Sequence, residues 1–140
     1  MCQYRSEVLS TAKILVVDSH PEVLAVARDA LKRASYDVLT ATSAGEALAI
    51  LGGDQRVDVL IAEVLLPGVR GTELLKTARR CRPSIAVVLM SGYTNGEIVD
   101  STVVFVPKPF TVGMLIDGVA RALKTGAAAC NRRHSARLTS

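Results

Sequence analysis

An apolar segment that ends in a carboxylate constrains the fold of this chain most. Residues 57–62 are apolar except for Asp58, and Glu63 follows them shortly before the turn-forming pair Pro67-Gly68. A short, nearly continuous apolar run of this kind indicates a strand buried on both faces, as in a parallel sheet. Parallel α/β folds bind ligands at the carboxyl ends of their strands. Glu63 therefore stands where a functional site is expected.

Strand-like and helix-like segments alternate over residues 13–124, which is the pattern of a parallel sheet with crossover helices. The other expected strands are residues 14–17, 36–40, 85–90 and 102–106. Helices are expected to start at Pro21, after a capping Ser43, at about Thr72 and after a capping Thr111. Residues 91–101 leave room for one or two helical turns, so the fourth helix is expected to be shortened.

Length and composition predict one globular domain. The 140 residues, with 49% hydrophobic and 21% charged side chains, predict a domain at 13–124, an N-terminal extension at 1–12 and a flexible basic tail at 125–140. No apolar run is long enough for a membrane span and no signal peptide is evident, so a cytoplasmic protein without a membrane partner is expected. The cysteines are expected to be free thiols. The net charge of +4 lies partly in the tail, and no motif predicts specific nucleic-acid binding.

Polar side chains follow or end four of the expected strands. They are Asp18, Ser19, Glu63, Ser91 and Lys108. Because the carboxyl ends of parallel strands emerge at the same edge of a sheet, these side chains are expected to converge. Carboxylates can hold a hard divalent cation, a hydroxyl can donate to an anionic oxygen, and an ammonium group can neutralise charge on a phosphoryl group.

Four segments in order resemble the response-regulator receiver domain. They are Ile14-Leu-Val-Val-Asp-Ser-His-Pro21, residues 58–71, Met90-Ser-Gly-Tyr93 and Phe105-Val-Pro-Lys-Pro-Phe110. Together they cover about residues 13–124, and their style is most similar to receivers of hybrid histidine kinases. The fold that we expect is α/β and CheY-like: a doubly wound, five-stranded parallel sheet of flavodoxin-like order 2-1-3-4-5.

The resemblance implies a role for each residue of the site. Glu63 stands at the phosphoacceptor position and would hold Mg²⁺ together with Asp18 and the backbone carbonyl of Leu65. The implied phosphate-binding and switch residues are Ser91, Phe105 and Lys108. The Lys108-Pro109 bond is a candidate cis peptide, as in the family.

Two positions depart from the family pattern. Ser19 replaces a metal-binding acid and Glu63 replaces the phosphoacceptor aspartate. Mg²⁺ usually needs one or two carboxylates, so its binding is expected to be weak. A nucleophile displaced by about 1 Å can lose on the order of 10²-fold in rate, so phosphorylation is expected to be impaired. Glu63 either pairs with Lys108 and holds one state or is a solvated acid. His20 is either a metal ligand in place of the missing acid or an exposed loop residue.

The expected function is that of a bacterial, stand-alone receiver in a two-component or phosphorelay system. It would be no enzyme, and it would dock to a histidine kinase, a phosphotransfer protein or another signalling protein through the surface around the first and last helices; a homodimer is left open. The alternative is a receiver that is still phosphorylated with Mg²⁺. A flavodoxin-like cofactor-binding protein is disfavoured because residues 19–22 do not form a phosphate-binding loop, and a hydrolase because Gly-x-Ser-x-Gly is absent.

Overall fold

Five parallel strands form the centre of the molecule. The computed structural model describes residues 11–92 and 102–139, of which 126–139 are described by their backbone only. The strands are β1 (Lys13–Val17), β2 (Asp37–Ala41), β3 (Val59–Glu63), β4 (Ala86–Ser91) and β5 (Val103–Pro107). They pair in parallel in the order β2-β1-β3-β4-β5, which confirms the predicted sheet.

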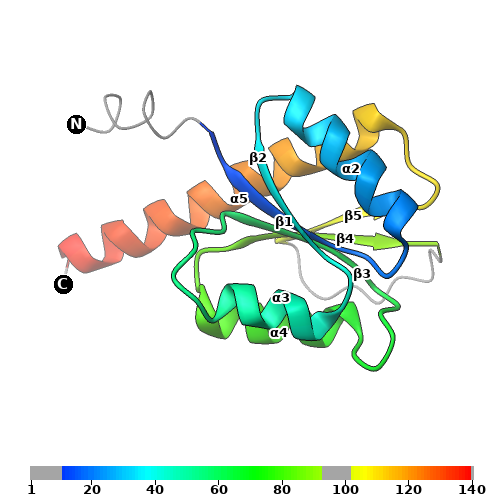
Figure 1. Cartoon of the computed structure of the whole chain (residues 1–140). Helices are drawn as coiled ribbons and strands as arrows, with labels where there is room; N and C mark the ends of the chain where they lie inside the picture. Colours follow the sequence, from blue (N-terminus) through cyan, green and yellow to red (C-terminus); the bar gives the residue numbers. More distant parts are fainter. Residues whose placement is uncertain (1–10, 93–101, 140) are drawn as a thin grey trace.

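Four helices cover the two faces of this sheet in the described part of the chain. Helices α2 (Pro21–Arg33) and α5 (Val112–Thr139) lie on one face, and α3 (Ala44–Leu51) and α4 (Gly71–Cys81) lie on the other (Figure 1). Alternate residues of β1 point to opposite faces: Leu15 and Val17 belong to the core under α3 and α4, whereas Ile14 and Val16 belong to the core under α2 and α5. The central strands are therefore buried on both sides, as the apolar runs predicted.

Local signals set the starts of the helices, with one correction. Pro21 is the first residue of α2, and Thr111 Oγ1 accepts a hydrogen bond from the Met114 backbone N–H at 3.1 Å, so both predicted starts are confirmed. Ser43 Oγ accepts from the Glu46 N–H at 3.2 Å, as a capping box requires. The reciprocal half of the predicted box is wrong, because the Glu46 carboxylate accepts from Thr42, at 2.6 Å from its N–H and 2.9 Å from its hydroxyl.

The last helix is longer than the sequence indicated. The predicted domain limit was Lys124, but α5 continues as a helix to Thr139 and extends beyond the sheet (Figure 1). At the other end, the β1–β2 ladder begins with Ala12, whose carbonyl accepts from the Asp37 N–H at 3.0 Å. The predicted shortened fourth helix falls at residues 93–101, which lie outside the described part of the chain.

None of the helices in residues 11–92 and 102–139 combines the length and the apolar character needed to cross a membrane.

Candidate functional site

Two buried acids meet at the carboxyl ends of the central strands. Val17 of β1 pairs with Ala62 of β3. Asp18 follows Val17 and Glu63 follows Ala62 along the chain, so the two acids lie side by side. The Asp18 side chain is 0% exposed and the Glu63 side chain 10% exposed. Two carboxylates at this depth repel each other and need a positive partner to remain ionised.

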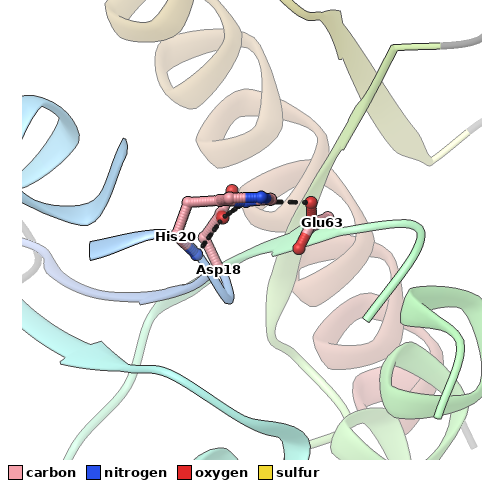
Figure 2. A group of neighbouring side chains, drawn as sticks. All are labelled: Asp18, His20 and Glu63. Atoms are coloured by element: carbon pink, nitrogen blue, oxygen red, sulfur yellow. Dashed lines mark hydrogen bonds and ion pairs between the residues drawn. The ribbon is translucent and has the colours of Figure 1, made fainter. Parts of the chain in front are cut away.

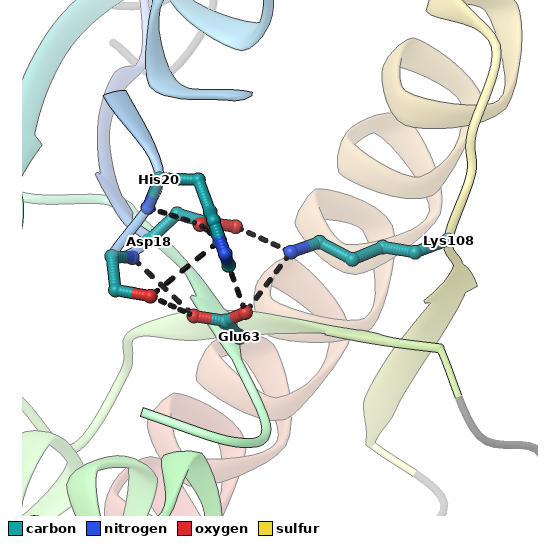
Figure 3. A network of polar contacts seen from close by, with 5 residues as sticks. Asp18, His20, Glu63 and Lys108 are labelled. Carbon is teal, nitrogen blue, oxygen red and sulfur yellow. Dashed lines mark hydrogen bonds and ion pairs between the residues drawn. The ribbon is translucent and has the colours of Figure 1, made fainter. Parts of the chain in front are cut away.

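Lys108 supplies that positive charge from the other side of β4. It follows β5, and its Nζ donates to Asp18 Oδ2 at 2.7 Å and to Glu63 Oε1 at 3.1 Å (Figure 3). Its own backbone N–H donates to the Ser91 carbonyl at 2.8 Å, and the bond from Lys108 to Pro109 is cis, as expected. The predicted convergence of the three charged side chains is therefore confirmed.

Its surroundings stabilise Lys108 in its charged form. Burial by itself lowers the pKa of Lys108, because it removes water from the ammonium group. Hydrogen bonds from this group to Asp18 and Glu63, together with the attraction of both carboxylates, outweigh that effect and raise the pKa above its ordinary value of 10.5. Lys108 is therefore a permanent counter-ion at neutral pH.

Ser19 occupies the other oxygen of Glu63. Its backbone N–H lies 3.3 Å from Glu63 Oε2 and its hydroxyl donates to the same atom at 3.1 Å. The sequence placed Ser19 among the converging polar side chains but did not predict this contact with Glu63. The substitution and the longer acid fit together, because the extra methylene brings a carboxylate to the hydroxyl that replaces the acid. Glu63 is thus held at both oxygens and is not a solvated acid.

His20 lies over the two acids. Its backbone N–H donates to Asp18 Oδ1 at 2.8 Å, and its Nδ1 lies 3.0 Å from the same oxygen and 3.7 Å from Glu63 Oε1 (Figure 2). The side chain is 61% exposed, so it forms the solvent side of the pocket. Both interpretations of His20 thus keep support: the residue is exposed, and it is also within reach of a shared metal ion.

The remaining predicted site residues surround this network. Ser91 ends β4 and is half-buried, and its carbonyl orients Lys108. Phe105 lies on β5 and is 37% exposed, and Leu65 follows β3 with a side chain 51% exposed. Their predicted roles in phosphate binding, switching and metal binding stay predictions.

Gly71 controls how closely α4 approaches Glu63. Its N–H donates to the Val64 carbonyl at 2.8 Å, and a methyl group at this glycine would collide with the Glu63 backbone carbonyl. The sequence did not predict this close approach. The close approach shows that this glycine fixes the backbone that carries the acid.

The donor set is compatible with a divalent cation. Carboxylate oxygens of Asp18 and Glu63 and the ring nitrogen of His20 lie within 4.8 Å of one another. Mg²⁺ binds through one or two carboxylates and retains several waters, so Asp18 and Glu63 would hold it. Bound there, the cation would neutralise charge on an incoming phosphoryl group. Lys108 already donates to both carboxylates, so the cation would share them with the lysine.

Comparisons with known proteins agree with this architecture. Residues 14–120 match the family model of the response regulator receiver domain. The chain is 35% identical over 122 residues to the hydrogenase transcriptional regulatory protein HoxA of Cupriavidus necator, covering 81% of this chain and 24% of HoxA. It spans 13% of the sensor kinase CckA of Brucella abortus and 35% of the response regulator SaeR of Staphylococcus aureus, so it covers only part of the length of these curated relatives.

Solved structures show the same likeness. A CheY-like receiver domain protein from Methanospirillum hungatei is 25% identical with a TM-score of 0.76, covering 85% of this chain and 98% of the other. The receiver domain of the hybrid histidine kinase CckA is 35% identical with a TM-score of 0.70, covering 80% of this chain and 99% of the other. The similarity to receivers of hybrid kinases is thus confirmed. With its fold, its strand-end pocket and these matches, the chain belongs to the response regulator receiver domain family, a signalling module of two-component systems.

Proposed function

We propose that this chain is a signalling receiver whose pocket is held in one state by Glu63 and Lys108 and which accepts a phosphoryl group poorly. The observation that carries the proposal is the pair of contacts from Lys108 Nζ, at 3.1 Å to Glu63 Oε1 and 2.7 Å to Asp18 Oδ2. In this arrangement the ammonium group donates to two side chains of the protein itself, without phosphate.

The hydrogen bonds of Glu63 oppose phosphoryl transfer. An attacking carboxylate oxygen must present a lone pair in line with the phosphoryl group at close approach. Oε1 accepts from Lys108, and Oε2 accepts from the Ser19 hydroxyl at 3.1 Å. Each of these hydrogen bonds draws electron density from the oxygen that accepts it, so either oxygen attacks only at the cost of weakening one of them. This cost adds to the misplacement caused by the extra methylene.

Phosphorylation by a small-molecule phosphodonor tests this proposal. The protein is incubated with Mg²⁺ and a small-molecule phosphodonor, and intact mass spectrometry measures the gain of one phosphoryl group. We expect Glu63→Asp to be labelled on the order of 10²-fold faster than the wild type, because the shorter acid restores the nucleophile's position.

A matched control shows whether the effect depends on which acid is shortened. Glu73→Asp shortens an exposed acid on α4 by the same methylene and should leave labelling at the wild-type rate. Wild-type labelling as fast as that of Glu63→Asp would overturn the proposal and establish the alternative, a receiver that is phosphorylated with Mg²⁺. Labelling of Glu63→Asp that is equal to the unreactive wild type would show that Glu63 alone does not block the reaction.

Receiver domains interact with histidine kinases and phosphotransfer proteins, and we propose a partner of this class here. The predicted docking surface corresponds to α2 and α5, which form an apolar groove lined by Val26, Val112 and Ile116. His20 directly precedes α2, and the groove lies further along this helix, from Val26 to Ala34. Val26 is 53% exposed, so Val26→Asp should weaken binding to a phosphotransfer protein in calorimetry without unfolding the domain. Unchanged binding would exclude this surface.

A further inference from the structure

We propose that Asp18, His20 and Glu63 form a binding site for a first-row transition-metal cation such as Ni²⁺ or Zn²⁺, with the imidazole of His20 as a ligand. The inference goes beyond the proposed signalling function and does not depend on whether Glu63 accepts phosphate. It rests on the spacing of three donor atoms, on their chemical type and on the charge of the pocket.

The spacing suits direct ligation by all three side chains. His20 Nδ1 lies 3.0 Å from Asp18 Oδ1 and 3.7 Å from Glu63 Oε1 (Figure 2). Ligand atoms at about 2.0–2.2 Å from a tetrahedral zinc ion lie about 3.4 Å from each other. The two separations from His20 Nδ1 bracket that value, and all three donor atoms lie within 4.8 Å of one another, so rotations of the side chains would bring them onto one ion.

His20 Nδ1 and Asp18 Oδ1 already lie close enough for one cation to bind both atoms. When the ring hydrogen is on Nδ1, this nitrogen donates to the Asp18 carboxylate. When the hydrogen is on Nε2, the lone pair of Nδ1 faces the same carboxylate oxygen, and a metal ion would bind to these two atoms in that tautomer. The backbone N–H of His20 also donates to Asp18 Oδ1 at 2.8 Å, which fixes the loop that presents the ring.

Lys108 does not block the ion. Its Nζ contacts Asp18 Oδ2, whereas His20 contacts Oδ1, so the two cations would use different oxygens of the same acid. Glu63 Oε1 would be shared, and a carboxylate oxygen has lone pairs for two partners. The two acids carry two negative charges and the lysine returns one positive charge, so the pocket keeps net negative charge for a further cation.

The donor type decides which metal binds. An imidazole nitrogen suits zinc, copper and nickel, whereas Mg²⁺ prefers oxygen and loses its waters reluctantly. Ser19 stands where a further acid would favour a hard cation, and its hydroxyl is turned to Glu63 Oε2. Because the His20 side chain is 61% exposed, its imidazole is accessible to an ion from solvent.

Calorimetric titration of the full chain with Ni²⁺ and with Mg²⁺ tests the inference. We expect one Ni²⁺ site, and we expect His20→Asn to weaken Ni²⁺ binding at least about tenfold, the lower limit for losing even an outer-shell partner of a metal ligand. The same variant should leave Mg²⁺ binding unchanged, because Mg²⁺ uses the acids alone. His134→Asn, which removes the other of the two histidines, should leave both affinities unchanged.

The outcomes that overturn the inference are specific. Equal Ni²⁺ affinity of His20→Asn and the wild type, or loss of binding in His134→Asn, would end it. With Co²⁺, intense near-ultraviolet absorption from thiolate ligation would place the metal on the cysteines and also end it.

A second readout needs no variant. Ni²⁺ should broaden the wild-type amide resonances of residues 18–20 and 63 before all others, and broadening centred elsewhere would contradict the site. No phosphodonor is present in either experiment, so a negative result leaves the proposed function of Glu63 and Lys108 untouched.

Discussion

The two ends of the central strands both carry charged side chains, but they use them differently. At the amino ends, Asp58 accepts from the Lys13 backbone N–H at 2.8 Å, and Arg82 donates to the carbonyls of Leu51, Gly53 and Gln55 at 3.1, 3.0 and 2.6 Å. At the carboxyl ends, Lys108 contacts the side chains of two buried acids.

The difference separates a scaffold from a site. Asp58 and Arg82 satisfy backbone groups that have no partner within a strand or helix, so the fold itself accounts for them. The buried charges at the carboxyl ends mainly satisfy one another. Such clusters are weak evidence for stability, because apolar residues of similar volume often serve a fold as well or better. The carboxyl-end network is therefore best explained by function.

Removing one charged side chain from each end of the strands should show the difference between the two ends most clearly. Lys108→Met leaves Asp18 and Glu63 buried without a counter-ion and should lower the free energy of unfolding by about 3 kcal/mol. Arg56→Met removes the exposed partner of Asp58, 3.0 Å away, and should cost less than about 1 kcal/mol. Urea denaturation measures both, and equal costs would contradict the distinction.

The three carbonyl contacts of Arg82 test the scaffold end directly. Lysine keeps the charge but lacks the planar fork that reaches several acceptors at once. Arg82→Lys should therefore lower the free energy of unfolding by about 1–2 kcal/mol and raise amide exchange between α3 and β3. The exposed Arg80 provides the control, and Arg80→Lys should have no measurable effect on either quantity.

Alkaline pH should weaken the carboxyl end selectively. The pKa of Lys108 is raised in the folded protein by Asp18 and Glu63 despite its burial, so its contribution to stability is complete below pH 10.5 and is lost as the pH rises through the raised pKa. The wild type should lose stability relative to Lys108→Met in this range, as measured by denaturation between about pH 9 and 12. Parallel curves for the two proteins would show that the ion pairs contribute nothing.

An exposed acid at the same edge gives the smallest expected effect. The Thr42 backbone N–H, and then its hydroxyl, lower the pKa of Glu46 below its ordinary value of 4.5. Its contribution is present above pH 4.5 and is lost as the pH falls through the lowered pKa. Glu46→Gln should flatten the acid side of the stability curve slightly, whereas Glu73→Gln should not. A loss as large as that of Lys108→Met would mean that burial does not distinguish the contacts of Glu46 from those of Lys108.

The sequence predicted the place of the site better than its contacts. Apolar runs with polar ends are sufficient to locate Asp18, Glu63 and Lys108 at one edge, because strand direction and alternation follow from local pattern. The hydrogen bonds of Ser19 and His20 depend on the backbone of the turn after β1, where His20 folds back to Asp18. No spacing rule predicts which oxygen of Glu63 each donor reaches.

The end of α5 was missed for a different physical reason. The prediction followed the apolar face, which stops near Lys124, whereas the helix continues to Thr139. Extending an existing helix fixes one residue for each new hydrogen bond, and Ala127-Ala128-Ala129 has the highest intrinsic helix propensity. The spacing of apolar residues indicates only which part of a helix packs against the sheet, and the helix can continue beyond that part.

The length of α5 means that a small tilt of this helix would move its far end by several ångströms. The helix has 28 residues and starts five positions after the last residue of β5, the strand that leads into Lys108. At about 1.5 Å per residue, the part beyond Lys124 is about 22 Å long, so a tilt of about 10° would swing its tip by about 4 Å. A rotation of α5 that is too small to disturb the sheet would thus displace the C-terminal end of the helix by about the length of a side chain.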